Sequence, residues 1–247
     1  ASQIQIAIER GGVKQISVAD NGHGMSKEDL VLSVSRHATS KISGFDDLSR
    51  VTSLGFRGEA LPSIASVSRL VIESRDGAEA TGWKMSGLGG EFGEPQPVSR
   101  PTGTRVTMED LFYNTPVRRK FLRTERTERG HIERVIKCLA LARPQTGFSF
   151  TADGRCLLSI PVETSPNEPQ RTESILGRAF CEHSIRVDSE AKGVTLTGWL
   201  GLPTFSRSQS DMQYCFINRR SVKDVSLSHA VRRAFSDVMS VSYTHLR

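Results

Sequence analysis

The sequence predicts a two-domain protein of mixed α and β structure. Alternating apolar patterns typical of strands recur between stretches with the period of amphipathic helices. A polar, proline-bearing stretch without periodicity, residues 161–170, divides the chain. The length of 247 residues fits either one large domain or two modest ones. We therefore expect a first domain over 1–162, a second over 171–240, and a short tail over 241–247.

Composition narrows the class of protein. The chain is 37% hydrophobic and 24% charged, as soluble globular proteins are. No apolar run approaches the ~20 residues that cross a bilayer, and no signal peptide is recognisable, so we expect no membrane. The expected location is the cytoplasm, associated with the nucleoid, in a bacterium, or the nucleus in a eukaryote. The four cysteines form no CxxC pair, which argues against a structural zinc site and a disulfide scaffold. They are Cys138, Cys156, Cys181 and Cys215.

The positive charge of the chain is concentrated in one stretch. The net charge is +6, and residues 118–143 hold nine basic residues against three Glu, a surplus equal to that of the whole chain. Such a density fits binding to a polyanion, either nucleic acid or nucleotide phosphate. It fits a solvated helix face equally well.

The chain opens with a predicted hairpin and a glycine-containing motif. Residues 2–8 and 13–19 alternate as strands do, with Gly11-Gly12 between them. Asp20-Asn21-Gly22-His23-Gly24-Met25 follows at the end of the second strand. Glycine lets a backbone approach a ligand closely, and the carboxylate can accept hydrogen bonds from an exocyclic amine such as that of adenine. An ordinary Asp-Asn-Gly turn is the alternative.

A helix start follows the motif. Ser26 is expected to be its N-cap, with Asp29 at the third helical position. Leu30, Val31 and Val34 are expected to form its buried stripe.

Two polar segments then precede a second helix. Residues 36–41, with the sequence RHATSK, read as a loop. Residues 54–61, LGFRGEAL, read as a glycine-hinged loop that leads into a helix over 60–67. The start of such a helix offers free backbone N–H groups, which suits phosphate binding.

The rest of the first domain is predicted from shorter signals. A glycine-rich loop is expected over 86–93, a helix at Thr115-Pro116, and a longer helix over 128–143 with a buried apolar face. The inward residues of the longer helix are expected to be Ile132, Val135, Ile136, Leu139 and Ala140. Strands are expected at 69–74, 83–85, 104–108, 148–151 and 155–160, the last two joined by an Asp153-Gly154 turn.

The second domain is expected to be smaller. Helices are predicted over 172–180 and 225–238, and strands over 185–189, 193–200 and 212–217. The apolar face of the last helix comprises Leu227, Ala230, Val231, Ala234 and Phe235. Basic side chains lie off this face or in the preceding hairpin, and form a candidate DNA-binding surface: Arg219, Arg220, Lys223, Arg232 and Arg233.

Three sets of motifs give the chain a family resemblance from residue 2 to about residue 238. They are DNGHGM at 20–25, RHATSK with GFRGEALPSIASVS at 36–41 and 55–68, and LFYNTPVRRKFL at 111–122, supported by QYCFINRR at 213–220. With them the chain resembles the N-terminal ATPase region of bacterial MutL-type mismatch-repair proteins, relatives of gyrase, Hsp90 and histidine kinases. The resemblance implies a two-layer α/β sandwich, with a mostly antiparallel sheet, followed by a ribosomal S5-like α/β domain.

The resemblance also implies a nucleotide site. Asp20 would accept the adenine amino group, with Thr104 beside it through a water. The segment 39–41 would belong to a lid, and 55–58 would hold the phosphates. The implied nucleotide-binding residues are Asp20, Asn21, Gly22, Gly24, Met25, Thr39, Ser40, Lys41, Gly55, Phe56, Arg57, Gly58, Glu59, Ala60, Leu61 and Thr104.

As function, the resemblance implies an ATP-driven switch whose N-terminal regions dimerise and which associates with DNA independently of sequence. The implied cofactors are ATP and Mg²⁺, and the implied partners are a mismatch-recognition protein and a downstream nuclease or helicase. One alternative is a DNA-binding module without a nucleotide site. Another is a gyrase-like topoisomerase subunit, which LFYNTPVRRKFL disfavours.

Some family features do not match residues of this chain. In the family, a helix before the opening strand carries the general base Glu and a Mg²⁺-binding Asn, and a Lys late in the second domain reaches the γ-phosphate. We expect the chain to start after that helix and to stop before that Lys, so no catalytic residue is assigned. Glu59 is expected to pair or cap rather than to replace the base. Residues 241–247, with the sequence VSYTHLR, match neither the last helix nor the family and are expected to be a non-native tail.

Overall fold

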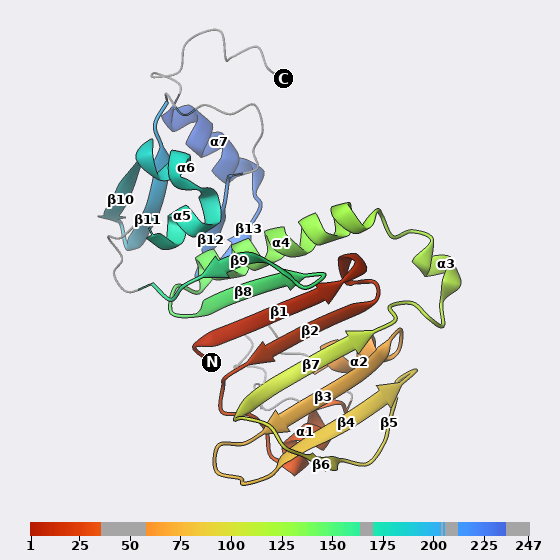
Figure 1. The fold of residues 1–247 in the computed structure, drawn as a ribbon. Helices are drawn as coiled ribbons and strands as arrows, with labels where there is room; N and C mark the ends of the chain where they lie inside the picture. Colours follow the sequence, from red (N-terminus) through yellow and green to blue (C-terminus); the bar gives the residue numbers. More distant parts are fainter. Residues whose placement is uncertain (36–57, 164–169, 204, 206–211, 236–247) are drawn as a thin grey trace. The chain divides into compact units, whose positions relative to one another are not determined.

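The computed structural model describes residues 1–35, 58–163, 170–203, 205 and 212–235. Contacts divide the chain into two compact units. The first comprises Ala1–Ala140 and Pro144–Val162, and the second comprises Leu141–Arg143 and Glu163–Arg247. Each unit is drawn in Figure 1 and is described by itself.

A nine-stranded sheet forms the body of the first unit. Its spatial order is β5-β4-β3-β7-β2-β1-β8-β9, and β6 also pairs with β4. The β1–β8 pair is parallel, whereas the other pairs are antiparallel. The strands are β1 Gln3–Glu9, β2 Gln15–Asp20, β3 Arg69–Arg75, β4 Gly82–Leu88, β5 Glu91–Phe92, β6 Gln96–Val98, β7 Gly103–Glu109, β8 Gly147–Ala152 and β9 Arg155–Ile160.

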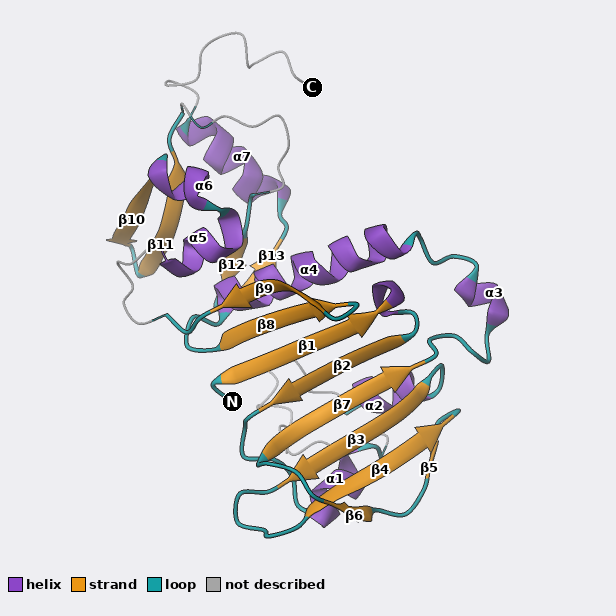
Figure 2. Ribbon diagram, in the orientation of Figure 1, coloured by secondary structure: helices purple, strands orange, loops and turns teal. Residues whose placement is uncertain are grey.

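Helices cover one face of this sheet (Figure 2). The helices of the first unit are α1 Lys27–Ser33, α2 Ala60–Ala65, α3 Pro116–Arg119 and α4 Glu125–Ala142, with a short 3-10 turn, η1 Arg10–Gly12, between β1 and β2. Of these, α3 lies beyond the ends of the strands (Figure 2). Helix α1 contacts β4 and α2 contacts β3, and Leu30, Leu70 and Ile72 are fully buried between them. Alternation along the strands sends apolar residues to this face, which explains the two-layer α/β sandwich that the sequence predicts.

Several predictions of elements need correction. The predicted glycine-rich loop over 86–93 is the tip of a hairpin, because β4 runs to Leu88 and pairs there with β5. Gly89 and Gly90, with φ of 64° and 94°, form its two-residue turn. The predicted inward residues Val31 and Val135 are 40% and 58% exposed, so the buried stripes of α1 and α4 are narrower than expected.

The second unit contains two separate hairpins and three helices. The hairpins are β10 Ser184–Ala191 with β11 Val194–Gly201, and β12 Cys215–Ile217 with β13 Arg220–Val222. The helices are α5 Gln170–Leu176, α6 Arg178–Glu182 and α7 Val225–Ala234. The single helix predicted over 172–180 is wrong, because Gly177 (φ 88°) separates α5 from α6. Within the described residues none of the side chains of α7 is fully buried.

No helix in the described part of the chain is both long enough and apolar enough to span a membrane.

Candidate functional site

Asp20, Thr104 and Ser74 form a row across three neighbouring strands. Ser74 of β3 pairs with Thr104 of β7. The β2–β7 ladder ends at Ala19 and Arg105, so the next residues along it are Asp20 and Thr104. Because side chains alternate, these three share the helix-covered face with the apolar row that includes Ile72, two residues earlier on β3. The apolar face of the sheet therefore ends in a polar row.

The Asp20 carboxylate is held by its own turn. Its Oδ1 accepts a hydrogen bond from the Gly22 N–H at 2.7 Å. Its Oδ2 accepts none from the residues that the structure describes, so one oxygen remains for a ligand. Asn21 has a different role, since its Oδ1 accepts the backbone N–H groups of Ser2 and Gln3 at 2.9 Å each and so ties the motif to β1.

Two glycines bring backbone segments together around this row. A Cβ on Gly24 would lie 1.9 Å from the Arg75 carbonyl oxygen, and a Cβ on Gly103 would lie 2.1 Å from that of Asp20. Both glycines have positive φ, 82° and 119°. The Gly77 N–H also donates to the His23 carbonyl at 3.0 Å, so the end of β3 holds the glycine motif from the other side.

Ser74 connects the two sides of the site. It is fully buried, and its Oγ accepts the Met25 N–H at 2.8 Å and lies 2.9 Å from the Thr104 Oγ1. Sequence reasoning missed Ser74, because it stands in an ordinary strand pattern outside every motif. The available signal was the register between β3 and β7, which a sequence pattern alone does not fix.

An arginine adds positive charge near the Asp20 carboxylate. Burial lowers the pKa of Arg100 from its usual value, and the negative charges of Glu73 and, more weakly, Asp20 oppose that shift. The Arg100 guanidinium also donates a hydrogen bond to the Glu73 carbonyl.

The predicted phosphate-binding residues are only partly described. Gly58 has a φ of 63°, Glu59 precedes α2 at the N-cap position without a side-chain cap bond, and Ala60 starts the helix. Leu61 is partly buried and packs against the core. The other predicted residues lie outside the described part of the chain: Thr39, Ser40, Lys41, Gly55, Phe56 and Arg57.

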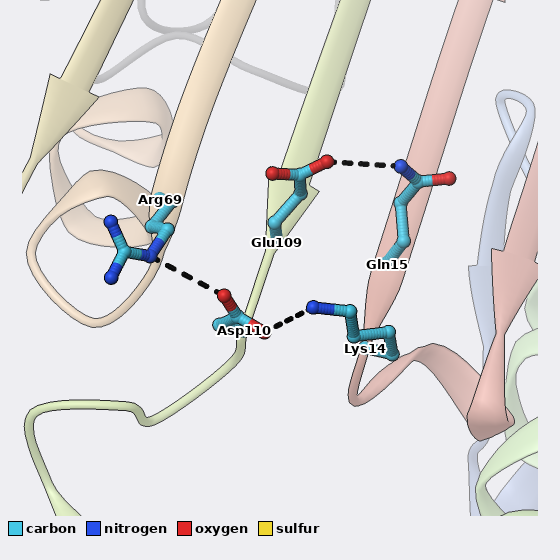
Figure 3. A network of polar contacts seen from close by, with 5 residues as sticks. All are labelled: Lys14, Gln15, Arg69, Glu109 and Asp110. Carbon is cyan, nitrogen blue, oxygen red and sulfur yellow. Dashed lines mark hydrogen bonds and ion pairs between the residues drawn. The ribbon is translucent and has the colours of Figure 1, made fainter.

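The third motif, residues 111–122, is anchored by the ion-pair network drawn in Figure 3. The Lys14 ammonium lies 2.8 Å from the Asp110 Oδ1, and the Arg69 Nε lies 3.3 Å from its Oδ2. The hydrogen bond from Lys14 is the main reason that the pKa of Asp110 falls below its usual range. Beside it the Gln15 amide donates to Glu109 at 3.1 Å.

This motif also holds the C-terminal end of α2. The Phe112 N–H donates to the Val67 carbonyl at 2.7 Å, and the Asn114 side-chain amide donates to the Ser66 carbonyl at 2.8 Å. Thr115 is the N-cap of α3 and Pro116 its first residue, as the sequence predicts, although the Thr115 side chain makes no cap hydrogen bond. Residues of the third motif therefore support the helix that the second motif begins.

The candidate DNA-binding residues of the second unit are all exposed. Asn218 and Arg219, with φ of 49° and 65°, form the two-residue turn between β12 and β13. Asp224 caps α7 by accepting the Leu227 N–H at 3.0 Å, which fixes the helix that carries Arg232 and Arg233. The exposed residues are Arg219, Arg220, Lys223, Arg232 and Arg233.

Two cavities in the first unit lie away from the polar row. One, of about 600 Å³, lies between α4 and the β8–β9 hairpin and is lined by Arg129, Glu133 and Arg155 among others. The other, of about 350 Å³, is lined mainly by residues of the sheet face opposite the helices, such as Gln5, Ser17 and Arg105. Among the described residues, no group of three or more His, Cys, Asp or Glu side chains could hold a metal ion.

Comparison with curated proteins finds bacterial MutL proteins. The DNA mismatch repair protein MutL of Pseudomonas putida (strain GB-1) is 46% identical over 241 residues, which are 97% of this chain and 38% of that protein. The MutL of Colwellia psychrerythraea is 43% identical over the same length, 37% of its own chain. This chain thus spans well under half of the relatives that it matches. A family model described as DNA mismatch repair protein, C-terminal domain, matches residues 172–244.

Solved structures agree in fold. The Aquifex aeolicus MutL ATPase domain complexed with ADP aligns with a TM-score of 0.69 and 29% identity, covering 94% of this chain and 80% of that one. The N-terminal domain of a DNA repair protein aligns with a TM-score of 0.75 and covers 97% of this chain and 75% of that one. At 24% identity it supports the fold alone. Together with the identity to bacterial MutL over nearly its whole length, these likenesses show that the chain belongs to the MutL family of DNA mismatch repair proteins.

Proposed function

We propose that the first unit binds ATP, with the adenine base at the row of Asp20, Thr104 and Ser74. The observation that carries the proposal is the Asp20 carboxylate, with one oxygen held by the Gly22 N–H and the other left to accept the adenine amino group. Thr104 lies next to it in the ladder and would contact the base through a water. The related Aquifex ATPase domain is a complex with ADP, which supports an adenine nucleotide as the ligand.

The phosphates would lie toward the start of α2. We assign them to residues 58–61 together with Gly55, Phe56 and Arg57, and we assign Thr39, Ser40 and Lys41 to a lid over the nucleotide. Positive φ at Gly58 allows the backbone to turn its N–H groups outward there. Mg²⁺ would accompany the triphosphate and offset its charge, and no residue of this chain is assigned as its ligand.

Isothermal titration of the chain with ADP, and with GDP as the control, tests the site. We expect ADP to bind and GDP to bind more weakly, because Asp20 offers an acceptor where guanine carries a carbonyl oxygen. A chain that binds DNA but neither nucleotide would refute the proposal. It would favour the alternative of a DNA-binding module without a nucleotide site.

For the whole protein we propose an ATP-driven switch in the cytoplasm. ATP binding would order the lid and promote dimerisation of the N-terminal regions, so that the conformational state rather than fast chemistry is the output. Membership in a mismatch-repair family supports a mismatch-recognition protein and a downstream nuclease or helicase as partners.

We propose DNA as a further partner, bound through the exposed basic residues of the β12–β13 turn and α7. Side chains that contact phosphates carry no sequence information, so this binding would be largely independent of sequence.

A further inference from the structure

Among the described residues of the first unit, two serines are fully buried, and their environments differ. The Ser68 Oγ donates only locally, to the Ile64 carbonyl at 2.7 Å. The Ser74 Oγ has three polar neighbours from two other segments: the Met25 N–H at 2.8 Å, the Gly103 carbonyl at 3.2 Å and the Thr104 hydroxyl at 2.9 Å. Ser74 therefore joins the glycine motif to the start of β7.

The three contacts of Ser74 determine the direction of its hydrogen bonds. A serine hydroxyl carries one proton and can accept two hydrogen bonds. The Met25 N–H can only donate and the Gly103 carbonyl can only accept. All three contacts are satisfied together only when Ser74 donates to Gly103 and accepts from both Met25 and Thr104. The proton of Thr104 then points at Ser74, away from the base.

We propose that Ser74 is a positioning residue that makes the site prefer a 6-amino purine to a 6-oxo purine, by keeping the Thr104 hydroxyl an acceptor toward the base. This inference rests on the proposed function. With the Thr104 proton committed to Ser74, both Thr104 and the free oxygen of Asp20 present lone pairs to the ligand. Two acceptors match an amino group directly or through a water, and they repel a carbonyl oxygen at the same place.

The same hydroxyl also fixes the backbone that surrounds the base. Met25 follows Gly24, whose close approach to Arg75 leaves no room for a side chain. The bond from Met25 to Ser74 therefore holds the glycine motif in register with the end of β3. Loss of this bond would expose the Met25 amide to exchange with solvent even without nucleotide.

Titration of the unsubstituted chain and its Ser74→Ala variant with ADP and with inosine diphosphate tests the proposal. Inosine diphosphate differs from ADP at the 6-position, where a carbonyl oxygen replaces the amine. We expect Ser74→Ala to lower the ADP-to-inosine diphosphate affinity ratio about three- to tenfold, the effect of one neutral hydrogen bond. Ser74→Thr, which keeps the hydroxyl, should restore the ratio. Hydrogen exchange of the Met25 amide should be faster in Ser74→Ala.

Ser68→Ala is the matched control, because it also removes a fully buried hydroxyl with a hydrogen bond. It should leave the ratio unchanged. Thr104→Val alone should also lower the ratio, and it tests the proposal if Ser74→Ala does not fold. In a protein that already carries Thr104→Val, adding Ser74→Ala should lower the ratio no further. An unchanged ratio in Ser74→Ala or in Thr104→Val, with ADP still bound by the unsubstituted chain, would overturn the role of Ser74 alone. Failure of the unsubstituted chain to bind ADP would overturn the nucleotide site, and the role of Ser74 with it.

Discussion

The carboxylate at the end of β2 offers the sharpest test of the nucleotide site. In Asp20→Asn, the amide oxygen would keep the hydrogen bond from the Gly22 N–H, which needs an acceptor at 2.7 Å. The amide nitrogen must then take the position of Oδ2 and point its protons at the adenine amino group. The substitution thus removes a charge-assisted hydrogen bond and places one N–H donor, the Asn amide, against another, the adenine amino group. A hydrogen bond to a charged group contributes about 1.5–3 kcal/mol, so ADP affinity should fall roughly ten- to hundredfold.

Isothermal titration of both proteins measures this loss, and thermal melting shows whether the variant is folded. Asn21→Ala is a useful comparison, because the structure gives Asn21 hydrogen bonds to β1 instead of a free acceptor. Asn21→Ala should lower the melting temperature clearly, whereas the affinity of the folded protein for ADP should change little. If a folded Asp20→Asn variant bound ADP as tightly as the parent, Asp20 would not be the adenine anchor.

Three further predictions concern the stability of the first unit and the DNA-binding surface of the second. Gly24→Ala should destabilise the first unit by more than the ~1–2 kcal/mol that the left-handed conformation costs a residue with a Cβ, because the new Cβ would also meet the Arg75 carbonyl. Thermal melts measure this, and an unchanged melting temperature would contradict it. Asp110→Asn should lower the melting temperature at pH 7, and the difference should shrink as the pH falls below the usual carboxyl pKa, because a carboxylate with a lowered pKa stabilises the fold above its usual pKa and loses this effect as it becomes protonated. Arg219→Glu with Arg232→Glu should weaken DNA binding for all sequences and leave ADP binding intact. The slope of log affinity against log salt concentration should become less steep by about two. An unchanged slope would assign DNA binding to another surface.

The fold was largely predictable because its signals are local. Ser26 caps α1 as the sequence predicts, with its hydroxyl accepting the Asp29 N–H at 3.1 Å. Asp153 and Gly154 form the β8–β9 turn in the left-handed conformation that the dipeptide favours. Gly177 was less predictable. A single glycine inside a helical pattern is often tolerated, and only the positive φ of 88° shows that here it separates two helices.

The glycines of the site were predictable as residue types, but their reasons were not. The sequence suggests that Gly24 and its neighbour Gly22 let a ligand approach. In the structure, the immediate constraint at Gly24 is the Arg75 carbonyl, a protein group from a strand about fifty residues later in the chain. A pattern of residues cannot distinguish space left for a ligand from space filled by another strand. The contacts between the glycine motif and the end of β3 show which of the two applies at Gly24.

Register explains why a motif can identify Asp20 and still miss Ser74. Asp20 is marked by the glycines that follow it, so its signal lies within six residues of sequence. Ser74 is marked only by its partner Thr104, thirty residues away, and a shift of one residue in that pairing would turn its hydroxyl to the opposite face. The apolar residues two positions earlier hold the pairing in place, since such a shift would also expose Ile72, which is fully buried. The hydrophobic core of the sheet therefore fixes the polar row at its end, and with it the direction in which Thr104 can present its hydroxyl to a base.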